Sequence, residues 1–456
     1  MYRMRHIWNE MRASFWFLPY LILTLAIVLA FALTHLDENA LEEWMKNYPR
    51  LFGASGAGAR AMLSTIAGSM ISVVGIVFSM TLVALALASS QYSSRVLRTF
   101  MRSRVTQASI GIFAGIFVYC IIVLRGVHGQ DDTVFVPVLA VSVAMVLAVV
   151  GVAVLIVFIH HIALSIQAST ILAHIAAETI AAIESIYPVP DDNALTGESA
   201  AAAAAAATVA RACWIPVLAP RSGYMQSIDH EALLRIACES RLMVRVERAV
   251  GQFVLEGTPV FSISGAAAAG WDGACALHKT ISVSAYRTVE QDPAFGVRQL
   301  VDVALKALSP GVNDSTTAAM CLDYLGAVIA SMARRAIPSP YRHAGGALKI
   351  VAVSPDFAGM LAEAFDQIRR SAGGNVAVIL RMIATIETLG SLAVDGRRHH
   401  DLLAQLDYIA ELCARTVPAP HDSALLAERL GPVRRALAAG CARHSERAPT
   451  PLRCEA

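Results

Sequence analysis

Four long apolar runs lie in the first 160 residues, and each is long enough to cross a membrane. The runs cover residues 15–34, 61–90, 105–124 and 134–159. A helix needs about 20 predominantly apolar residues to cross a hydrocarbon core of about 30 Å. Because lipid offers no hydrogen-bond partners to the backbone, each run is predicted to be a membrane-spanning α-helix. The composition agrees, with 56% hydrophobic residues and a mean hydropathy of +0.55.

The charges on the segments that flank these runs predict their orientation. Arg3, Arg5 and Arg12 precede the first run, and residues 91–104, between the second and third runs, contain four arginines and no acidic residue. In the other two connections, acidic residues offset or outnumber the basic ones. Positively charged connections stay in the cytoplasm. We therefore expect a multi-pass protein of the bacterial cytoplasmic (inner) membrane with both termini in the cytoplasm.

The first run also has features of a secretory signal. It follows a basic start and contains Ala30–Ala32, which resembles a signal-peptidase site. The run is longer than the apolar part of such a signal, so we expect it to be retained as a helix. Cleavage is the alternative, and it would leave the topology of the remaining chain unchanged.

Beyond residue 160 the sequence changes from wholly apolar to amphipathic. Apolar residues recur at helical spacing from Ile162 to Ile183, and Val244 and Val246 alternate with charged residues as in a half-buried strand. We predict an integral membrane α-helical protein with four transmembrane helices, followed by a cytoplasmic α+β region with a small β-rich module and a helical C-terminal part. The predicted segments are a four-helix transmembrane domain (1–160), an amphipathic connecting helix (161–190), an alanine-rich linker (191–212), the α+β domain with its β module (213–335), a C-terminal α-rich region (346–443) and a disordered tail (444–456).

The second run carries a stripe of small and hydroxyl-bearing residues. They follow one another at steps of three or four, which places them on one helix face. These residues are Ser64, Gly68, Ser72, Gly75 and Ser79. One interpretation is close packing against other helices, for which membrane helices favour small residues. The other is a pore lined by hydroxyl groups from several copies of this helix.

Three arginines share a helical face just past the predicted cytoplasmic end of the second run: Arg95, Arg98 and Arg102. The preference for positive charge on the cytoplasmic side is sufficient to explain them. They can also contact anionic lipid headgroups, where each charge contributes about 1 kcal/mol. In a pore, the same ring would favour anions at the inner mouth.

The segment from residue 287 to residue 314 holds the strongest candidates for a ligand site or a coupling element. A helix is predicted over Pro293–Leu308, followed by a turn at Pro310-Gly311 and a helix cap at Asn313 or Asp314. These structural roles are sufficient to explain the segment. The functional alternative gathers its polar side chains around a small polar ligand of unknown identity: Arg287, Asp292, Arg298, Asp302, Asn313 and Asp314.

Four segments of the chain resemble one protein family. They are Phe78–Arg95, Phe158–His161, Gln291–Arg298 and Leu308–Asp314. Together they look like the bacterial predicted-membrane-protein family called domain of unknown function 2254. The resemblance covers nearly the whole chain and implies an integral membrane protein that begins with four helices. The family has no assigned reaction, so the resemblance implies no catalytic residue.

No motif for catalysis, a cofactor or a metal stands out in the sequence. Walker, nucleophile-elbow, H-E-x-x-H and dinucleotide-binding patterns are absent. The eight cysteines form no C-x-x-C pair, and the pairs His160-His161 and His399-His400 do not supply a full ligand set. We therefore expect no catalytic residue, no cofactor and no metal. A net charge of +2 gives no reason to expect nucleic acid as a partner.

The leading hypothesis is a passive ion or small-solute channel that assembles as a homo-oligomer in the lipid bilayer. Its second helix would line the path, and its cytoplasmic region would gate it. The alternative is a membrane-anchored scaffold or ligand sensor that does not conduct. A membrane-associated enzyme is a third hypothesis, and it requires that neutral replacement of Asp292 or Asp314 abolish activity while the fold is kept.

Overall fold

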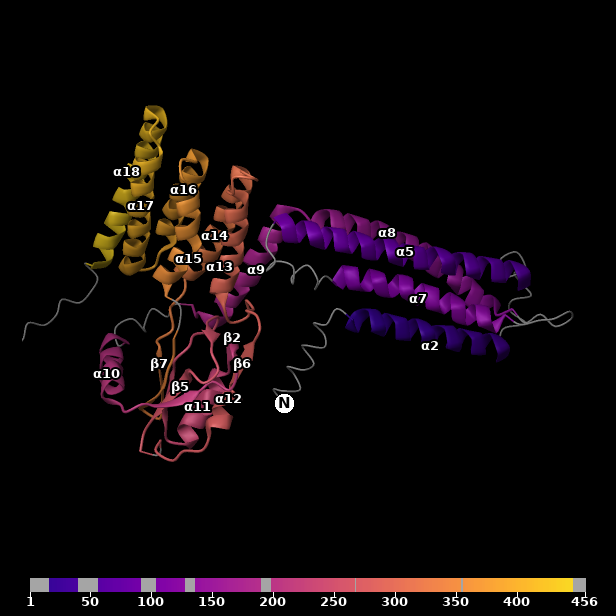
Figure 1. Cartoon of the computed structure of the whole chain (residues 1–456), viewed down its shortest axis with the longest axis horizontal. Helices are drawn as coiled ribbons and strands as arrows, with labels where there is room; N and C mark the ends of the chain where they lie inside the picture. The colour runs from indigo at the N-terminus through magenta and orange to yellow at the C-terminus, as the bar shows by residue number, and fades with distance from the viewer. Residues whose placement is uncertain are drawn as a thin grey trace, which may run out of the picture. The chain divides into compact units, whose positions relative to one another are not determined.

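The computed structural model describes seven stretches of the chain and divides it into two compact units. The described stretches are residues 16–39, 56–91, 104–127, 136–189, 198–266, 268–353 and 356–445. The N-terminal unit is Met1–Thr170 and the C-terminal unit is Ile171–Ala456. Figure 1 shows the elements of both units, and each unit is described by itself.

Each of the four predicted apolar runs forms one long helix of the N-terminal unit. The helices are α2 (Phe17–Asn39), α5 (Gly56–Gln91), α7 (Arg104–Gly126) and α8 (Val138–Ser165). Helix α7 packs against the other three. Its buried side chains, which include Phe113, Ile116 and Tyr119, fill the core of this unit.

Helices α2 and α7 run in the same direction and approach each other closely through glycines. A Cβ atom added to Gly111 would lie 2.9 Å from Pro19 Cα, and one added to Gly115 would lie 3.3 Å from Ala26 Cβ. Further along, Gly126 lies against Thr34. The GxxxG pair of the third run is therefore a packing motif between these two helices.

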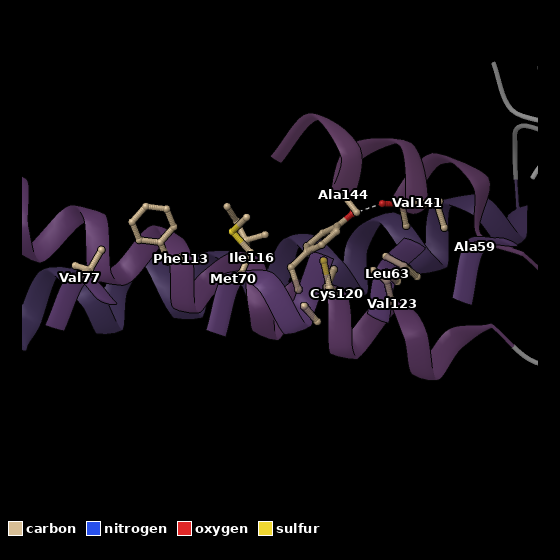
Figure 2. Packing of buried hydrophobic residues seen from close by; sticks show 14 of the residues in the cluster. Ala59, Leu63, Met70, Val77, Phe113, Ile116, Cys120, Val123, Val141 and Ala144 are labelled. Atoms are coloured by element: carbon tan, nitrogen blue, oxygen red, sulfur yellow. Dashed lines mark hydrogen bonds between the residues drawn. The ribbon is translucent and has the colours of Figure 1, made fainter. Parts of the chain in front are cut away.

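Helices α5 and α8 run opposite to α7. The Arg60 guanidinium donates to the Val127 carbonyl (3.0 Å), whereas Met70 and Ile116 both contact Gly151 of α8. In Figure 2 the labelled residues of α5 and α7 follow opposite numbering along the pair. The hydroxyl of Tyr119 donates to the Ala140 carbonyl (2.8 Å) and joins α7 to α8. This alternation of directions is what four successive membrane crossings require.

Six helices in the described stretches are long and apolar enough to cross a membrane. They are α2, α5, α7, α8, α9 (Ala168–Ile186) and α14 (Ser315–Ala333). Length and composition alone therefore do not select the four predicted spans. The predicted connecting helix (161–190) is also interrupted, because α8 ends at Ser165 and α9 begins at Ala168.

The C-terminal unit contains two β-sheets. A five-stranded sheet has the order β1-β5-β3-β8-β7, and a three-stranded sheet has the order β4-β2-β6. The strands are β1 (Ile215–Leu218), β2 (Gly223–Ile228), β3 (Met243–Val246), β4 (Phe253–Val254), β5 (Pro259–Ser264), β6 (Ile281–Ser284), β7 (Tyr341–Ala344) and β8 (Ala347–Val351). Helices α10 (Glu198–Arg211), α11 (His230–Glu239) and α12 (Ala274–His278) belong to the same part of the chain. The alanine run is helical in α10.

The five-stranded sheet joins two segments that the sequence analysis separates. Strand β8 pairs in parallel with β3, and β7 pairs antiparallel with β8. Residues 336–345, which fall between the two predicted segments 213–335 and 346–443, therefore include a strand, Tyr341–Ala344. The predicted segment boundaries otherwise stay predictions.

The rest of the C-terminal unit is a stack of helical hairpins. The hairpins are α13 (Pro293–Ala307) with α14, α15 (Phe357–Ser371) with α16 (Val376–Leu392), and α17 (Gly396–Thr416) with α18 (Pro420–Ser445). They stand side by side in Figure 1, with α13, α15 and α17 in one layer and α14, α16 and α18 in the other. The first helix of each hairpin is capped by an aspartate: Asp292, Asp356 and Asp395.

We expect Gly111→Ala to destabilise the N-terminal unit more than Gly115→Ala does. At Gly111 the new methyl group meets the Pro19 backbone, which cannot move aside easily, whereas at Gly115 it meets the side chain of Ala26. Overpacking of this kind costs about 1–3 kcal/mol. The measurement is the thermal unfolding midpoint of the full-length protein in detergent. Equal midpoints for the two variants would contradict the close approach of α2 and α7.

Candidate functional site

The stripe of small residues on α5 faces away from the helices of its own chain. Ser64, Gly68, Ser72, Gly75 and Ser79 are all exposed. Among the residues that the structure describes, nothing lies within 4 Å of a Cβ added to Gly68 or Gly75. The stripe therefore does not serve packing within the N-terminal unit of a single chain, in contrast to the two glycines of α7.

The opposite face of α5 is the one that packs into the core. Leu63, Met70 and Val77 are buried there against α7 and α8 (Figure 2). At 100° per residue, the centre of the stripe lies about 160° around the helix from these buried residues. From Ser64 to Ser79 the stripe extends about 22 Å along the helix axis, most of the thickness of a hydrocarbon core.

The hydroxyl groups of this region bond to their own helix. Ser72 Oγ donates to the Gly68 carbonyl (2.9 Å), and Thr65 and Ser69 donate to carbonyls three or four residues earlier. A hydroxyl that donates in this way is less costly to place in a membrane and keeps its oxygen lone pairs for another partner. The arginines predicted at the inner end of this helix, Arg95, Arg98 and Arg102, lie outside the described residues.

In the C-terminal unit, Arg287 and Asp292 form a bidentate ion pair. Arg287 Nε donates to Asp292 Oδ2 (2.7 Å) and Nη2 donates to Oδ1 (3.0 Å). Asp292 is 4% exposed and also accepts from the Phe295 N–H at the start of α13. Burial raises the pKa of Asp292, while the hydrogen bonds and charge of Arg287 and the Phe295 N–H oppose that rise.

Two glycines make room for this ion pair and for the helix that follows it. A Cβ added to Gly251, which has a φ of +89°, would collide with Asp292 Oδ2. A Cβ added to Gly296 would collide with Thr179 of α9. The loop before β4 therefore meets the ion pair itself, whereas the middle of α9 meets α13 at Gly296, about one helical turn beyond Asp292.

The structure does not bring the six predicted polar residues of this segment together. Helix α13 has 15 residues, so its two ends are about 22 Å apart. Arg287 and Asp292 lie at its first end, whereas Asn313 and Asp314 follow its last. Between them, Arg298 pairs with Glu363 of α15 (2.5 Å), and Asp302 is half-buried on α13.

Asp314 performs the predicted capping role. Its Oδ1 accepts from the N–H groups of Thr316 and Thr317, and its Oδ2 accepts from the Thr317 hydroxyl (2.5 Å). These bonds lower the pKa of Asp314, with those of Thr317 contributing most. Asn313 has a positive φ of 49°, a backbone conformation that asparagine tolerates better than most residues. A ligand role for these two residues stays a prediction.

Sequence reasoning missed two arginines that bind helix ends, the half-buried Arg335 and the buried Arg398. Arg335 binds the C-terminal end of α9, and Arg398 binds the C-terminal end of α14. One signal for Arg398 was present in the sequence. It shares a helical face with Leu402, Leu406 and Ile409, so it stands at a position where an apolar residue is expected.

An apolar groove of about 420 Å³ lies along strand β1 in the C-terminal unit. Its lining includes Pro216, Trp271 and His278. The His278 ring bonds to the Leu218 carbonyl (2.8 Å), and Pro216 has no N–H to offer. Both features reduce the hydrogen-bonding capacity of the strand edge. In the described stretches, no three His, Cys, Asp or Glu side chains are grouped so that they could hold a metal.

We expect Asp292→Asn to lower the free energy of unfolding by about 2–3 kcal/mol, because it leaves the partly buried Arg287 without its counter-charge. Asp323→Asn is the matched control. Asp323 pairs with Arg381 and both side chains are about half exposed, so a change within about 0.5 kcal/mol is expected. The measurement is unfolding of the full-length protein in detergent. Equal losses for both variants would contradict the structural role of the Arg287–Asp292 pair.

Comparison with known proteins gives the family. The family profile described as "Predicted membrane protein (DUF2254)" matches residues 12–388. Similar proteins include the uncharacterized proteins Rv1290c of Mycobacterium tuberculosis and Mb1321c of Mycobacterium bovis. Each is 32% identical over 387 residues, which cover 82% of this chain and 72% of the relative. No solved structure matches the chain. The protein is therefore a membrane protein that belongs to the family called domain of unknown function 2254.

Proposed function

We propose that the protein is a passive channel for ions or small solutes in the bacterial inner membrane. Several copies would assemble so that their α5 helices surround the path. The observation that carries this proposal is the exposed stripe on α5, opposite the face that packs into the core. In lipid, an exposed helix face is expected to be apolar, so a face of serines and glycines favours contact with another copy or with water.

We propose further that four of the six apolar helices cross the membrane. The remaining two have contacts typical of a folded domain outside lipid. Helix α9 packs on α13 where Thr179 meets Gly296. Helix α14 carries Asp323, which pairs with Arg381 of α16 (3.3 Å), and both side chains are about half exposed. A charged pair exposed at the middle of a helix is unfavourable in hydrocarbon.

The four proposed crossings also predict the orientation of the chain in the membrane. Four crossings in alternating directions, with both termini on one side, fit the parallel α2 and α7 and the antiparallel α5 and α8. The arginines before the first helix and between the second and third favour the cytoplasm for the termini. The C-terminal unit would then be cytoplasmic and available to gate the path.

A scaffold or ligand sensor that does not conduct is the second candidate. The same stripe supports it, because small residues also allow helices of different copies to pack closely. An enzyme has less support. The Asp292 carboxylate is already bound by Arg287 and a backbone N–H, and the Asp314 carboxylate by Thr316 and Thr317, so neither is poised to act on a substrate.

The test is ion flux through the purified full-length protein in liposomes. If α5 lines the path, Ser72→Phe should reduce flux to the level of empty liposomes, because an aromatic ring fills the space beside the helix. Ala153→Phe adds the same ring at an exposed position of α8 and should leave flux unchanged. Equal flux from the wild type and Ser72→Phe would remove α5 from the path. Absence of flux from folded oligomers in several salts would favour the scaffold or sensor.

A further inference from the structure

Arg335 fastens the C-terminal end of α9 to the residues that follow α14. Its guanidinium donates to the carbonyls of Tyr187 (2.9 Å) and Glu184 (3.4 Å) and pairs with the Glu184 carboxylate (3.0 Å). The Ala336 N–H donates to the Pro188 carbonyl (2.9 Å) beside it. A helix end leaves its last carbonyls without intrahelical partners, and here a cation from another segment satisfies them.

Arg398 of α17 fastens those same residues from the other side. Its Nη1 donates to the Ala333 carbonyl (2.8 Å) and its Nη2 donates to the Arg335 carbonyl (2.6 Å). The guanidinium lies over the Phe357 ring (5.6 Å) and its Nε is 3.5 Å from Asp395 Oδ2. Arg398 is only 3% exposed. The backbone of Arg335 is therefore held by α17 while its side chain holds α9.

Because Arg398 is buried, its guanidinium depends on the acceptors that surround it. Burial lowers the pKa of Arg398, which shows that its charge is partly withdrawn from water, and Asp395 and Asp401 oppose that shift. A buried cation that loses its acceptors is strongly unfavourable. Arg398 therefore favours one position of the α14 end, the position in which both carbonyls point at its guanidinium. Because the side chain of Arg335 bonds to the end of α9, the position of the α14 end also affects the position of α9.

Helix α9 is connected to the N-terminal unit through very few residues. Only Ile166 and Gln167 separate it from α8, the last long helix of that unit. Arg335 acts at the C-terminal end of α9, and Arg398 acts on the residues that position Arg335. A continuous set of hydrogen bonds therefore connects α17 to α9, and a change in the packing of α17 can act on α9 through it.

We propose that Arg398 and Arg335 form a two-step linkage that couples the packing of α17 to the position and stability of α9. The linkage is independent of whether the protein conducts, so it can fail or hold whatever the flux measurement gives. It provides a path by which an event at the hairpin of α17 and α18, such as the binding of a partner, reaches the helix that follows the membrane unit.

The test is amide hydrogen exchange of the full-length protein in nanodiscs, followed in peptides that cover residues 180–189, the last turns of α9 and the residues that follow it. Arg398→Ala should speed exchange there at least about fivefold, the lower end of coupling between linked sites. This effect is expected although Arg398 bonds to the end of α14 rather than to α9. Arg335→Ala should speed exchange at α9 directly.

The double variant decides whether the two arginines act in series. In the Arg335→Ala background, Arg398→Ala should add much less at α9 than it does alone, because only the Ala336–Pro188 backbone bond still connects the two helix ends. Arg381→Ala is the control, since it removes an exposed ion pair between α16 and α14 and should leave α9 unchanged. The proposal is overturned if Arg398→Ala leaves α9 unchanged, if it speeds α16 equally through general unfolding, or if its effect on α9 is undiminished without Arg335.

Discussion

Lipid as a solvent is the constraint on which the N-terminal unit depends. Every helix face that does not meet another helix must suit hydrocarbon, and the exposed faces of α2 and α8 do so with residues such as Leu25, Val149 and Ile156. The exposed face of α5 departs from this rule along the stripe from Ser64 to Ser79, which lies beside the exposed apolar side chains of Ile71 and Ile76. Since α7 uses its own glycines to approach α2, the small residues of α5 are the ones left for a contact outside the chain.

The C-terminal unit depends on a different device, which is the binding of helix ends by charged side chains. Asp292 caps α13 and is paired with Arg287, while Arg335 and Arg398 satisfy carbonyls at the ends of α9 and α14. The contacts of Arg335 and Arg398 join segments that are far apart in sequence, and they connect α9 to the helical stack.

Local patterns predicted the elements well and their long-range pairing poorly. Periodicity and turn residues gave α13 to within one residue, because those signals lie within the segment itself. Strand β7 was missed, since it forms only by pairing with β8 in a sheet assembled from distant segments. The break after Ser165 was missed because apolar residues continue across it. Residue spacing does not show that Gly251 lies too close to Asp292 for a side chain, or that the α5 stripe points away from its own chain. Both depend on how distant segments pack in three dimensions.

The central claim is that the stripes of neighbouring copies meet along α5. Oxidative cross-linking of single cysteines in native membranes tests it most directly, in a background from which the eight natural cysteines have been removed. The account predicts cross-linked dimers from Ser72→Cys and none from Val77→Cys, which points into the core of its own chain. Cross-linking through Val149→Cys on the exposed face of α8, with none from Ser72→Cys, would contradict it.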